Sequence, residues 1–463
     1  MVDSYVNFAN SKIGDKLTSM LGLPRPVRLR RTDCDWKFEE QTVLIGSASD
    51  RFIAGTDLLA ALDRMSVKRL AIPNDHVSSN QDSWDGTAAL HALVYDARAL
   101  DDSSNSGCLH SFFNQSVQKL RDSGRIIVIA NTPMTCARPC HQVAQRALEG
   151  LVRSLGKECR RGITAQLVYV DECGASECGT GESLESTLRF LLSGASAYVS
   201  GQVIKLASRN FETSRIDWER PLLGQRILVT GASQGIGLAI AEVLASQGAE
   251  LACLDIPQNQ LALEAVTKKL NGSSITLDIT DGKAPDTLLK YARDIGGLNA
   301  LVHNAGITRD KTIARMAPQL WKQVVDVNLS AQERINSALV DQGGFAENAR
   351  VVTVSSISGI AGNRGQTNYA YSKAGVIGLV QAYASRFDEA GMTINAVAPG
   401  FIETEMTAAI PFAVREAGRR LNSMSQGGLP VDVAETIAWF ANPASYAVNG
   451  NVVRVCGQSL LGA

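Results

Sequence analysis

Apolar and polar positions in the second half of the chain alternate between strand-like and helix-like patterns. The segment "QRILVTGASQGIGLAIAEVLASQGAELACLDI" contains a β-branched strand, a glycine-rich turn, a helix with apolar residues three and four apart, and a second strand that ends at Asp255. The runs "LNALVHNAG", "ARVVTVSS" and "MTINAVAPG" are typical of parallel strands, and helical segments such as "APQLWKQVVDVNLSAQERINSALV" separate them. This alternation predicts an α/β fold with a doubly wound parallel sheet.

Three segments of the first half match segments of the second half in the same order. "GRIIVIANT" corresponds to "ARVVTVSSI", "ALEGLVRSLGKECRRGITAQLVYV" to "GVIGLVQAYASRFDEAGMTINAV", and "TLRFLLSGASAYVSGQVIKLAS" to "TIAWFANPASYAVNGNVVRVCG". We therefore expect a duplicated α/β domain. The predicted organisation is an N-terminal extension (1–35), a first α/β domain (36–210), a polar linker (211–222) and a second α/β domain (223–463).

The first copy has lost the side chains that could carry chemistry in the second. The matches place Asn131 opposite Ser356, His141 opposite Tyr369, and Gln145 opposite Lys373. In the turn "IGSASDRF", Asp50 and Phe52 stand where the second copy has Gly235 and Gly237, so a close backbone approach to a pyrophosphate is lost. We expect the first domain to be non-catalytic.

Composition is that of an ordinary globular protein, with 45% hydrophobic and 20% charged residues among 463. The net charge of −1 gives no reason to expect a nucleic acid or an anionic membrane as partner. No apolar run approaches the roughly 20 residues that span a bilayer, and the start lacks the apolar core of a secretion signal, so we expect a cytoplasmic protein. The nine cysteines form no disulfide framework, and "CARPCH" lacks a second ligand pair, so no metal site is expected.

Candidate cofactor chemistry lies in "TGASQGIG". Its glycines Gly231, Gly235 and Gly237 allow a tight turn that exposes the N-terminal N–H groups of the next helix to a phosphate, although such turns can also be simple helix caps. Asp255 follows at the end of the second strand, where a carboxylate accepts from ribose hydroxyls and repels a 2′-phosphate. Gln234 has no charge to offset that repulsion, so the pattern favours NAD over NADP.

A second candidate is the stretch "RGQTNYAYSKAG". On a helix Tyr369 and Lys373 are four residues apart and share a face, whereas Tyr371 and Lys373 are two apart and point in different directions. A phenol has an ordinary pKa near 10, and a neighbouring ammonium would stabilise its charged form. The same spacing is common on ordinary helices, so it does not by itself decide a function.

Five ordered motifs together make residues 223–463 resemble a short-chain dehydrogenase/reductase. They are "TGASQGIG", Asp278 in "LDIT", "NAG" at Asn304, Ala305 and Gly306, the set Asn328, Ser356, Tyr369 and Lys373, and "APGFIETEM" with Thr404. The resemblance implies that the four-residue set is a catalytic tetrad. His303 departs from the family, many members of which have a second asparagine before "NAG".

The resemblance also implies a set of residues that bind the nicotinamide cofactor. These are Gly231, Ser233, Gln234, Gly235, Ile236, Gly237, Asp255, Asp278, Ile279, Asn304, Ala305, Gly306, Tyr369, Lys373, Pro399, Gly400, Ile402 and Thr404. Asp278 would contact the adenine, and Thr404 the nicotinamide carboxamide. We expect NADH to be the cofactor, with NADPH less suitable.

Within that family, "GNRGQTNYAYSKAG", "INAVAPGFIETEMT" and "GNVVRVCG" are most similar to β-ketoacyl-acyl carrier protein reductases. The whole chain resembles their long, two-domain form, in which a degenerate flavodoxin-like or Rossmann-like domain precedes the reductase. That form implies reduction of 3-oxoacyl-CoA or 3-oxoacyl-acyl carrier protein to the (3R)-hydroxyacyl thioester with NADH. The alternatives are a related enzyme for another alcohol or ketone, and a silent NAD-binding scaffold.

Two further expectations concern the C-terminal part of the chain. The region from Thr404 to Pro430 is expected to form a substrate lid, in which the basic residues Arg415, Arg419 and Arg420 meet carrier phosphates or form a solvated helix face. The apolar segments "ETIAWFA" and "GNVVRVCGQSLLGA" predict more apolar surface than one sheet edge covers, and so a homodimer.

Overall fold

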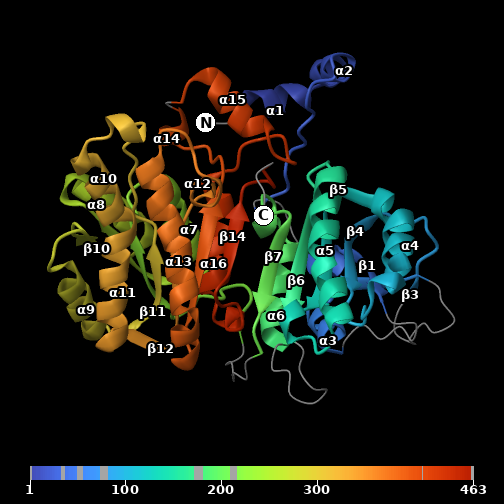
Figure 1. The fold of residues 1–463 in the computed structure, drawn as a ribbon, viewed down its shortest axis with the longest axis horizontal. Helices are drawn as coiled ribbons and strands as arrows, with labels where there is room; N and C mark the ends of the chain where they lie inside the picture. Colours follow the sequence, from blue (N-terminus) through green and yellow to red (C-terminus); the bar gives the residue numbers. More distant parts are fainter. Residues whose placement is uncertain are drawn as a thin grey trace. The chain divides into compact units, whose positions relative to one another are not determined.

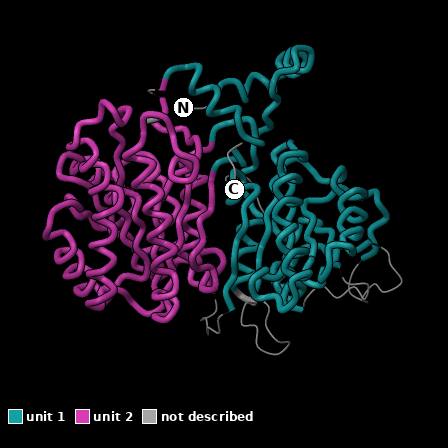
Figure 2. Tube along the Cα trace, viewed as in Figure 1, with its two compact units in different colours: residues 1–212, 411–427, 456–460 teal, residues 213–410, 428–455, 461–463 magenta. Residues whose placement is uncertain are grey.

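The computed structural model describes residues 3–32, 37–48, 56–72, 82–171, 181–208, 216–408 and 410–459. Contacts divide the chain into two compact units, which Figure 2 distinguishes by colour. Unit 1 comprises residues 1–212, 411–427 and 456–460, and unit 2 comprises residues 213–410, 428–455 and 461–463. Two segments of the expected 223–463 domain, residues 411–427 and 456–460, belong to unit 1.

The described part of unit 1 contains a seven-stranded sheet in which neighbouring strands are parallel (Figure 1). Its strands are β1 (Thr42–Ser47), β2 (Lys68–Ala71), β3 (Asp82–Ser83), β4 (Leu90–Asp96), β5 (Leu120–Asn131), β6 (Thr164–Val170) and β7 (Gln202–Leu206). Its helices are α1 (Ser4–Ala9), α2 (Lys12–Met20), α3 (Thr56–Arg64), α4 (Gly107–Ser116), α5 (Pro139–Glu158), α6 (Gly181–Leu192) and α15 (Phe412–Arg420).

The described part of unit 2 contains a second seven-stranded parallel sheet. Its strands are β8 (Arg226–Thr230), β9 (Glu250–Asp255), β10 (Ser273–Thr276), β11 (Leu298–His303), β12 (Phe345–Val354), β13 (Thr393–Pro399) and β14 (Val452–Val455). Its helices are α7 (Gly235–Ser246), α8 (Gln260–Leu270), α9 (Ala284–Asp294), α10 (Pro318–Val325), α11 (Ala331–Asp341), α12 (Ile357–Ala361), α13 (Thr367–Glu389), α14 (Glu405–Ala408) and α16 (Pro430–Ala441).

The two sheets have the same topology. Their orders are β3-β2-β1-β4-β5-β6-β7 and β10-β9-β8-β11-β12-β13-β14, so each reads 3-2-1-4-5-6-7 when numbered from its own first strand. The first six strands follow the Rossmann order, which differs from the flavodoxin order 2-1-3-4-5. The predicted doubly wound parallel fold is confirmed, and in the first copy the Rossmann-like description is the one that the strand order matches.

A pair of buried arginines occupies the same place in both units. In β5, Arg125 donates to the carbonyl oxygens of Ser123, at 2.8 Å, and Ser193, at 2.8 Å. In β12, Arg350 donates to the carbonyl oxygens of Asn348 and, at 2.9 Å, Pro443. Because a buried guanidinium needs acceptors for its N–H groups, each copy retains two carbonyl contacts, one of which is shifted by one residue between the copies. The internal repeat of the sequence is therefore a repeat of three-dimensional structure.

The interior strands are apolar on both faces because helices cover both sides of each sheet. Every residue of β6 and of β13 is buried. Helix α16 packs on α7 and on β12, β13 and β14, and its side chains from Val433 to Ala441 are largely buried. In the described part of the chain, no helix is long and apolar enough to cross a membrane.

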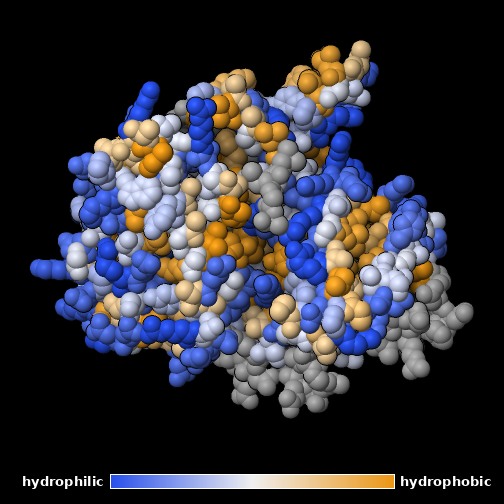
Figure 3. Space-filling view, in the orientation of Figure 1, coloured by the Kyte–Doolittle hydropathy of each residue, from blue (hydrophilic) through white to orange (hydrophobic). Residues whose placement is uncertain are grey.

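The N-terminal helices of unit 1 carry several of the exposed apolar side chains. Ile13 is 72% exposed and Met20 is 84% exposed, and Phe8 and Leu17 are also exposed. Figure 3 shows apolar side chains gathered over α2. The N-terminal extension is therefore ordered as two short helices that keep much apolar surface in contact with solvent.

Candidate active site

The glycine-rich turn joins β8 to α7 at the carboxyl end of the sheet in unit 2. Gly235 has a φ of +59°, which glycine adopts without steric cost, and the space where its Cβ would lie is open. At Gly237 a Cβ would lie 1.9 Å from the carbonyl oxygen of Gly231, so only glycine fits. The turn thus leaves room beside the N-terminus of α7, where we predict that a phosphate binds.

Asp255 lies at the end of β9 and is bonded to that turn. One carboxylate oxygen accepts from the backbone N–H of Ser233 at 3.0 Å, and the other accepts from the N–H of Ile256 at 2.8 Å and from the amide of Asn259 at 3.0 Å. A carboxylate offers about four acceptor positions, so one remains for a ribose hydroxyl. The sequence pattern missed the structural role of Asp255 in fixing the turn.

The turn also holds a buried polar atom without a partner among the described residues, the hydroxyl of Ser233. A buried hydroxyl is normally hydrogen-bonded, and a phosphate oxygen at the open turn would supply the missing acceptor. The residues therefore fit the dinucleotide that the motif implies.

Asn304 fastens the end of β11 to the same turn. Its amide donates to the carbonyl oxygens of Thr230 and Gly231, each at 3.0 Å. The hydroxyl of Thr230 accepts from the backbone N–H groups of Asn304 and Ala305, each at 3.1 Å. The "NAG" motif is thus a clamp between two adjacent strand ends. Thr230 was not among the predicted site residues, and its place just before the first glycine was the only signal for it.

The structure separates the two tyrosines of α13 as the spacing predicts. The Lys373 ammonium nitrogen lies 5.7 Å from the centroid of the Tyr369 ring. Tyr371 is 55% exposed, and its ring packs against Trp321 at a centroid distance of 5.4 Å. Only Tyr369 shares a face with the lysine.

The ammonium group of Lys373 has a backbone partner. Its ammonium donates to the carbonyl oxygen of Val354 at 2.7 Å, and burial lowers its pKa to about 8. Ser355, which the sequence did not single out, donates from its hydroxyl to the Lys373 carbonyl oxygen at 2.7 Å. The lysine is therefore held by the end of β12.

The phenol of Tyr369 is kept protonated. Burial raises its pKa, and the hydrogen bond with the Ser356 side chain opposes that shift only in part. Burial therefore outweighs the lowering of the phenol pKa that we expected from Lys373. A phenol that stays protonated at neutral pH is suited to donate a proton.

Asn328 lies in a π-helical turn, Asp326–Ser330, that joins α10 to α11. Its side chain accepts from the N–H of Ile307 at 2.8 Å and donates to the Ile307 carbonyl oxygen at 3.0 Å and to the Ser372 hydroxyl at 3.1 Å. The long helix predicted for this segment is therefore interrupted by the π-turn that contains Asn328. Such turns occur frequently at functional sites. The four tetrad residues come from the π-turn, the end of β12 and α13.

Comparison with known proteins agrees with this geometry. A family profile described as Enoyl-(Acyl carrier protein) reductase matches residues 231–457. The 3-oxoacyl-[acyl-carrier-protein] reductase of Vibrio cholerae is 37% identical over 237 residues, which are 51% of this chain and 97% of the relative. The chain belongs to the short-chain dehydrogenase/reductase family. The reductases of the same name from Thermotoga maritima and Escherichia coli are 37% and 36% identical, over 98% and 96% of their lengths and 51% and 50% of this chain.

Other residues that are predicted to contact the cofactor lie at or after the ends of strands in unit 2. Pro399 ends β13, Gly400 donates from its N–H to the Val455 carbonyl oxygen at 2.9 Å, and Ile402 is buried. The Thr404 N–H donates to the Thr407 hydroxyl at 2.9 Å. Beyond β10, Asp278 is exposed and accepts from the N–H of Thr280 at 2.9 Å.

His303, the departure from the usual family motif, is buried at the end of β11. Its Nε2 lies 2.8 Å from the side-chain oxygen of Asn336, and burial lowers its pKa to about 4. The imidazole is therefore neutral near pH 7, and it packs as an uncharged core residue beneath the clamp.

The residues of unit 1 that match three members of the tetrad contact one another. The side-chain oxygen of Gln145 accepts from the N–H of Asn131 at 2.7 Å, and its amide donates to the carbonyl oxygens of Ala97 and Leu100. His141 Nε2 lies 3.4 Å from the Asn131 amide nitrogen. The three replacements form a buried structural network. The turn with Asp50 and Phe52 lies outside the described residues.

The three arginines expected near a carrier have partners inside unit 1. Arg420 donates to the Asp3 carboxylate at 2.6 Å and to Glu416 at 3.0 Å, and it lies 4.5 Å from the centroid of the Tyr5 ring. Arg419 pairs with Glu416, and the Arg415 guanidinium carbon lies 5.9 Å from the centroid of the Phe412 ring. Neither Arg419 nor Arg420 belongs to a solvated helix face, because burial and ion pairing fix both.

Proposed function

We propose that unit 2 reduces the C3 ketone of a 3-oxoacyl thioester, carried by coenzyme A or acyl carrier protein, to the (3R)-hydroxyl with NADH. The observation that supports this most strongly is that Tyr369 and Lys373 share one face of α13, with Ser356 beside the phenol and the Lys373 ammonium bonded to the end of β12. The relatives that match this half of the chain are named for the same reaction on acyl carrier protein.

In the proposed reaction a bound nicotinamide supplies the hydride that reaches the ketone carbon. Tyr369 donates its proton to the ketone oxygen, and the Ser356 hydroxyl donates a hydrogen bond to the same atom. One ketone, one NADH and one proton become one alcohol and one NAD⁺. Lys373 binds the ribose of the nicotinamide nucleotide, and the turn that Asn328 fixes supports a water relay that restores the Tyr369 proton.

We also propose that NADH is preferred over NADPH, because the Asp255 carboxylate would face a 2′-phosphate. The test is kcat/KM with both cofactors in the wild type and in Asp255→Asn, which removes the charge and keeps one of the two acceptor oxygens. We expect NADH to be preferred and the ratio to shift toward NADPH by about tenfold in the variant, since one unit of like charge is removed.

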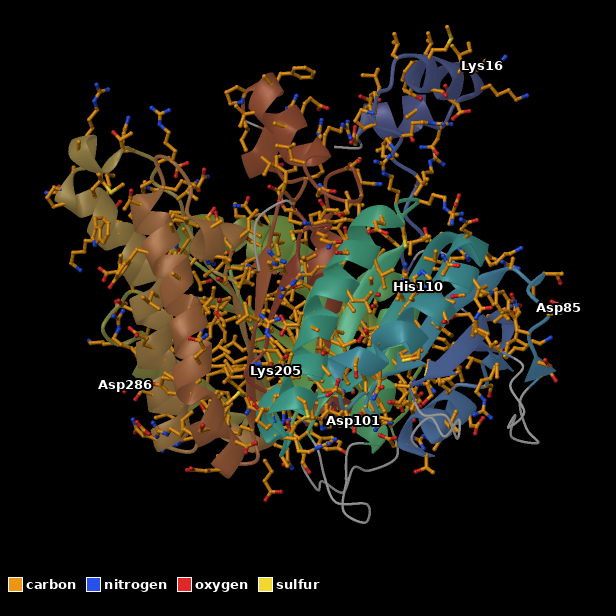
Figure 4. The ribbon with its side chains drawn as sticks, turned by 45° about the vertical axis from the view of Figure 1, so that its right-hand side comes forward. Lys16, Asp85, Asp101, His110, Lys205 and Asp286 are labelled. Atoms are coloured by element: carbon orange, nitrogen blue, oxygen red, sulfur yellow. The ribbon has the colours of Figure 1, made fainter. Side chains whose placement is uncertain are left out.

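The matched control is Asp286→Asn, an exposed carboxylate on α9 of the same unit (Figure 4). It removes the same charge and should leave the cofactor ratio unchanged. Equal or better use of NADPH by the wild type would refute the preference, and an equal shift in both variants would mean that Asp255 has no local role.

The description of the family profile gives a second candidate, reduction of an enoyl thioester. A panel of 3-oxoacyl and 2-enoyl thioesters on coenzyme A and on acyl carrier protein separates the two, and unrelated ketones test the wider alternative. Turnover of enoyl substrates alone would overturn the proposed reaction. NADH binding without turnover of any substrate would favour a silent scaffold.

We also propose that the protein forms a homodimer, although the segment "ETIAWFA" does not supply the interface. The apolar residues of "ETIAWFA" are buried within the single chain, so they leave little surface for a partner. The exposed apolar side chains of α1 and α2 are the better support (Figure 3). Among the described residues, Cys108, Cys140, Cys159 and Cys253 are free thiols, which supports our proposal of a reducing cytoplasmic location.

A further inference from the structure

Unit 1 contains a cavity of about 480 Å³ whose charged lining is entirely basic among the described residues. Three separate stretches form it: residues 22–27 of the N-terminal extension, residues 157 and 160–162 around the end of α5, and residues 420–425 from the end of α15. The basic side chains are Arg25, Lys157, Arg160, Arg161 and Arg420. We call this the basic cavity.

The positive charge of the basic cavity is only partly compensated. Arg25 pairs with Asp15, Arg161 lies 3.4 Å from Asp122, and Arg420 pairs with Asp3, but none of these carboxylates lines the cavity.

Two of the cations have no such partner. Lys157 and Arg160 are exposed and form no ion pair among the described residues. Like charges that converge on one concavity repel each other, so an anion that enters would be attracted by several cations at once.

The remaining lining indicates what kind of anion fits. The cavity is also lined by apolar side chains, namely Leu23, Pro24, Pro26, Val27, Leu421 and Met424. Its volume lies within the range of about 300 to 1,000 Å³ that is usual for small organic ligands. Guanidinium groups bind phosphates through paired N–H donors. A ligand with more than one phosphate and an apolar portion would use both kinds of lining.

We propose that the basic cavity binds an organic phosphate with two or more phosphate groups, of the adenosine 3′,5′-bisphosphate type. That group occurs as a free nucleotide and as the end of coenzyme A. The assignment to coenzyme A rests on the proposed function, whereas the anion site rests only on the residues of unit 1.

The cavity is linked through the chain to the reductase unit. Residues 420–425 belong to the 411–427 segment. The chain passes from unit 2 into this segment and then back into unit 2. The residues on either side of the segment are hydrogen-bonded to each other, and we call this point the neck. At that neck the Glu403 N–H donates to the Gly428 carbonyl oxygen at 2.8 Å, and the Gly428 N–H donates to the Phe401 carbonyl oxygen at 3.0 Å.

The 411–427 segment is also fastened inside unit 1. Gln426 donates to the Val27 carbonyl oxygen at 2.8 Å, and Tyr198 donates to the Gln426 carbonyl oxygen at 2.8 Å. Because a ligand in the basic cavity would contact this segment, its binding should slow amide hydrogen exchange across residues 411–427.

The test is calorimetric titration of the full chain with adenosine 3′,5′-bisphosphate, in the presence of saturating NADH so that the nucleotide site of unit 2 is filled. The test variant is Lys157→Gln with Arg160→Asn, which removes two unpaired charges. Asparagine is chosen because residue 160 has a φ of +46°. The control is Lys12→Gln with Lys16→Gln, which removes two exposed charges from α2 (Figure 4). Melting temperatures check that all variants fold.

We expect saturable binding to the wild type and the control, and binding at least about tenfold weaker in the test variant. Adenosine without phosphate should not bind. Absence of binding to the wild type, equal affinity in the test variant, or equally tight binding of inorganic phosphate would each overturn the proposal. Loss of acyl carrier protein binding in the test variant, with no nucleotide binding to the wild type, would assign the surface to an acidic protein instead.

Coenzyme A and the free nucleotide are compared in parallel to distinguish the two sources of the ligand. A 3-oxoacyl thioester of N-acetylcysteamine, which has no phosphate, tests the reductase separately. Nucleotide binding without turnover of this substrate would leave the basic cavity valid and the proposed function wrong. Turnover without nucleotide binding would support the proposed function and refute the proposed ligand of the basic cavity.

Discussion

The pair of hydroxyl deletions on α13 tests the active site most sharply. Tyr369→Phe and Tyr371→Phe each remove one oxygen from residues two apart on one helix. Tyr369 is hydrogen-bonded with Ser356 and lies near the Lys373 ammonium, whereas Tyr371 is half exposed and contacts Trp321 through its ring. The two changes are therefore chemically identical and differ only in what surrounds the oxygen.

The expected magnitudes differ by orders of magnitude. Loss of a general acid lowers kcat by about 100-fold to 10,000-fold, which is about 3 to 5 kcal/mol of transition-state stabilisation. The structural cost of Tyr369→Phe is only about 1 kcal/mol, because one hydrogen bond is lost. Tyr371→Phe keeps its ring contact and should change kcat by less than about twofold.

The assay follows NADH oxidation by its absorbance, with a 3-oxoacyl thioester as substrate and NADH affinity measured separately. We expect Tyr369→Phe to bind NADH normally and to lose turnover. Lys373→Ala should lower kcat at least as much and also raise the KM for NADH, because the ribose contact is lost. If Tyr371→Phe abolished turnover while Tyr369→Phe kept near-normal kcat, both the spacing argument and the assigned active site would be wrong.

Two predictions concern stability. The folded pKa of His303 is about 4 against an ordinary value of 6.5, so the unfolded chain binds the proton first and stability falls as the pH drops through that window, by up to about 3 kcal/mol. Urea unfolding at pH 7 and pH 5 should show a smaller loss in His303→Asn than in the wild type, and an equal loss would contradict this. Gln145→Ala removes the side-chain partner of the Asn131 N–H and of the Leu100 carbonyl oxygen, whereas the Ala97 carbonyl oxygen keeps its bond from the Leu100 N–H, and should cost about 3 kcal/mol by the same assay. Its kcat per folded molecule should be unchanged, and a selective loss of kcat would reveal a function in unit 1.

The sequence predicted those features of the fold that depend on residues close together along the chain. The alternation of apolar runs and helical periods predicted the parallel sheets, and the matched segments predicted the internal repeat, because each depends on residues that are neighbours along the chain. The four-residue spacing of Tyr369 and Lys373 predicted their shared face for the same reason. The glycine turn was equally local, since Gly235 and Gly237 are required by backbone conformation and close approach.

The tertiary structure decided whatever depends on contacts between distant residues. The phenol pKa of Tyr369 rises because burial outweighs its polar neighbours, and the Lys373 ammonium bonds to Val354 on another strand. The apolar side chains of α16 are buried within the chain, so the apolar composition of this helix did not predict exposed surface.

The basic cavity is the clearest case of such long-range control. It joins residues near positions 25, 160 and 420, and no local pattern connects them. Local rules fix helices, strands and turns, but desolvation and ion pairing are set by which segments the fold brings together.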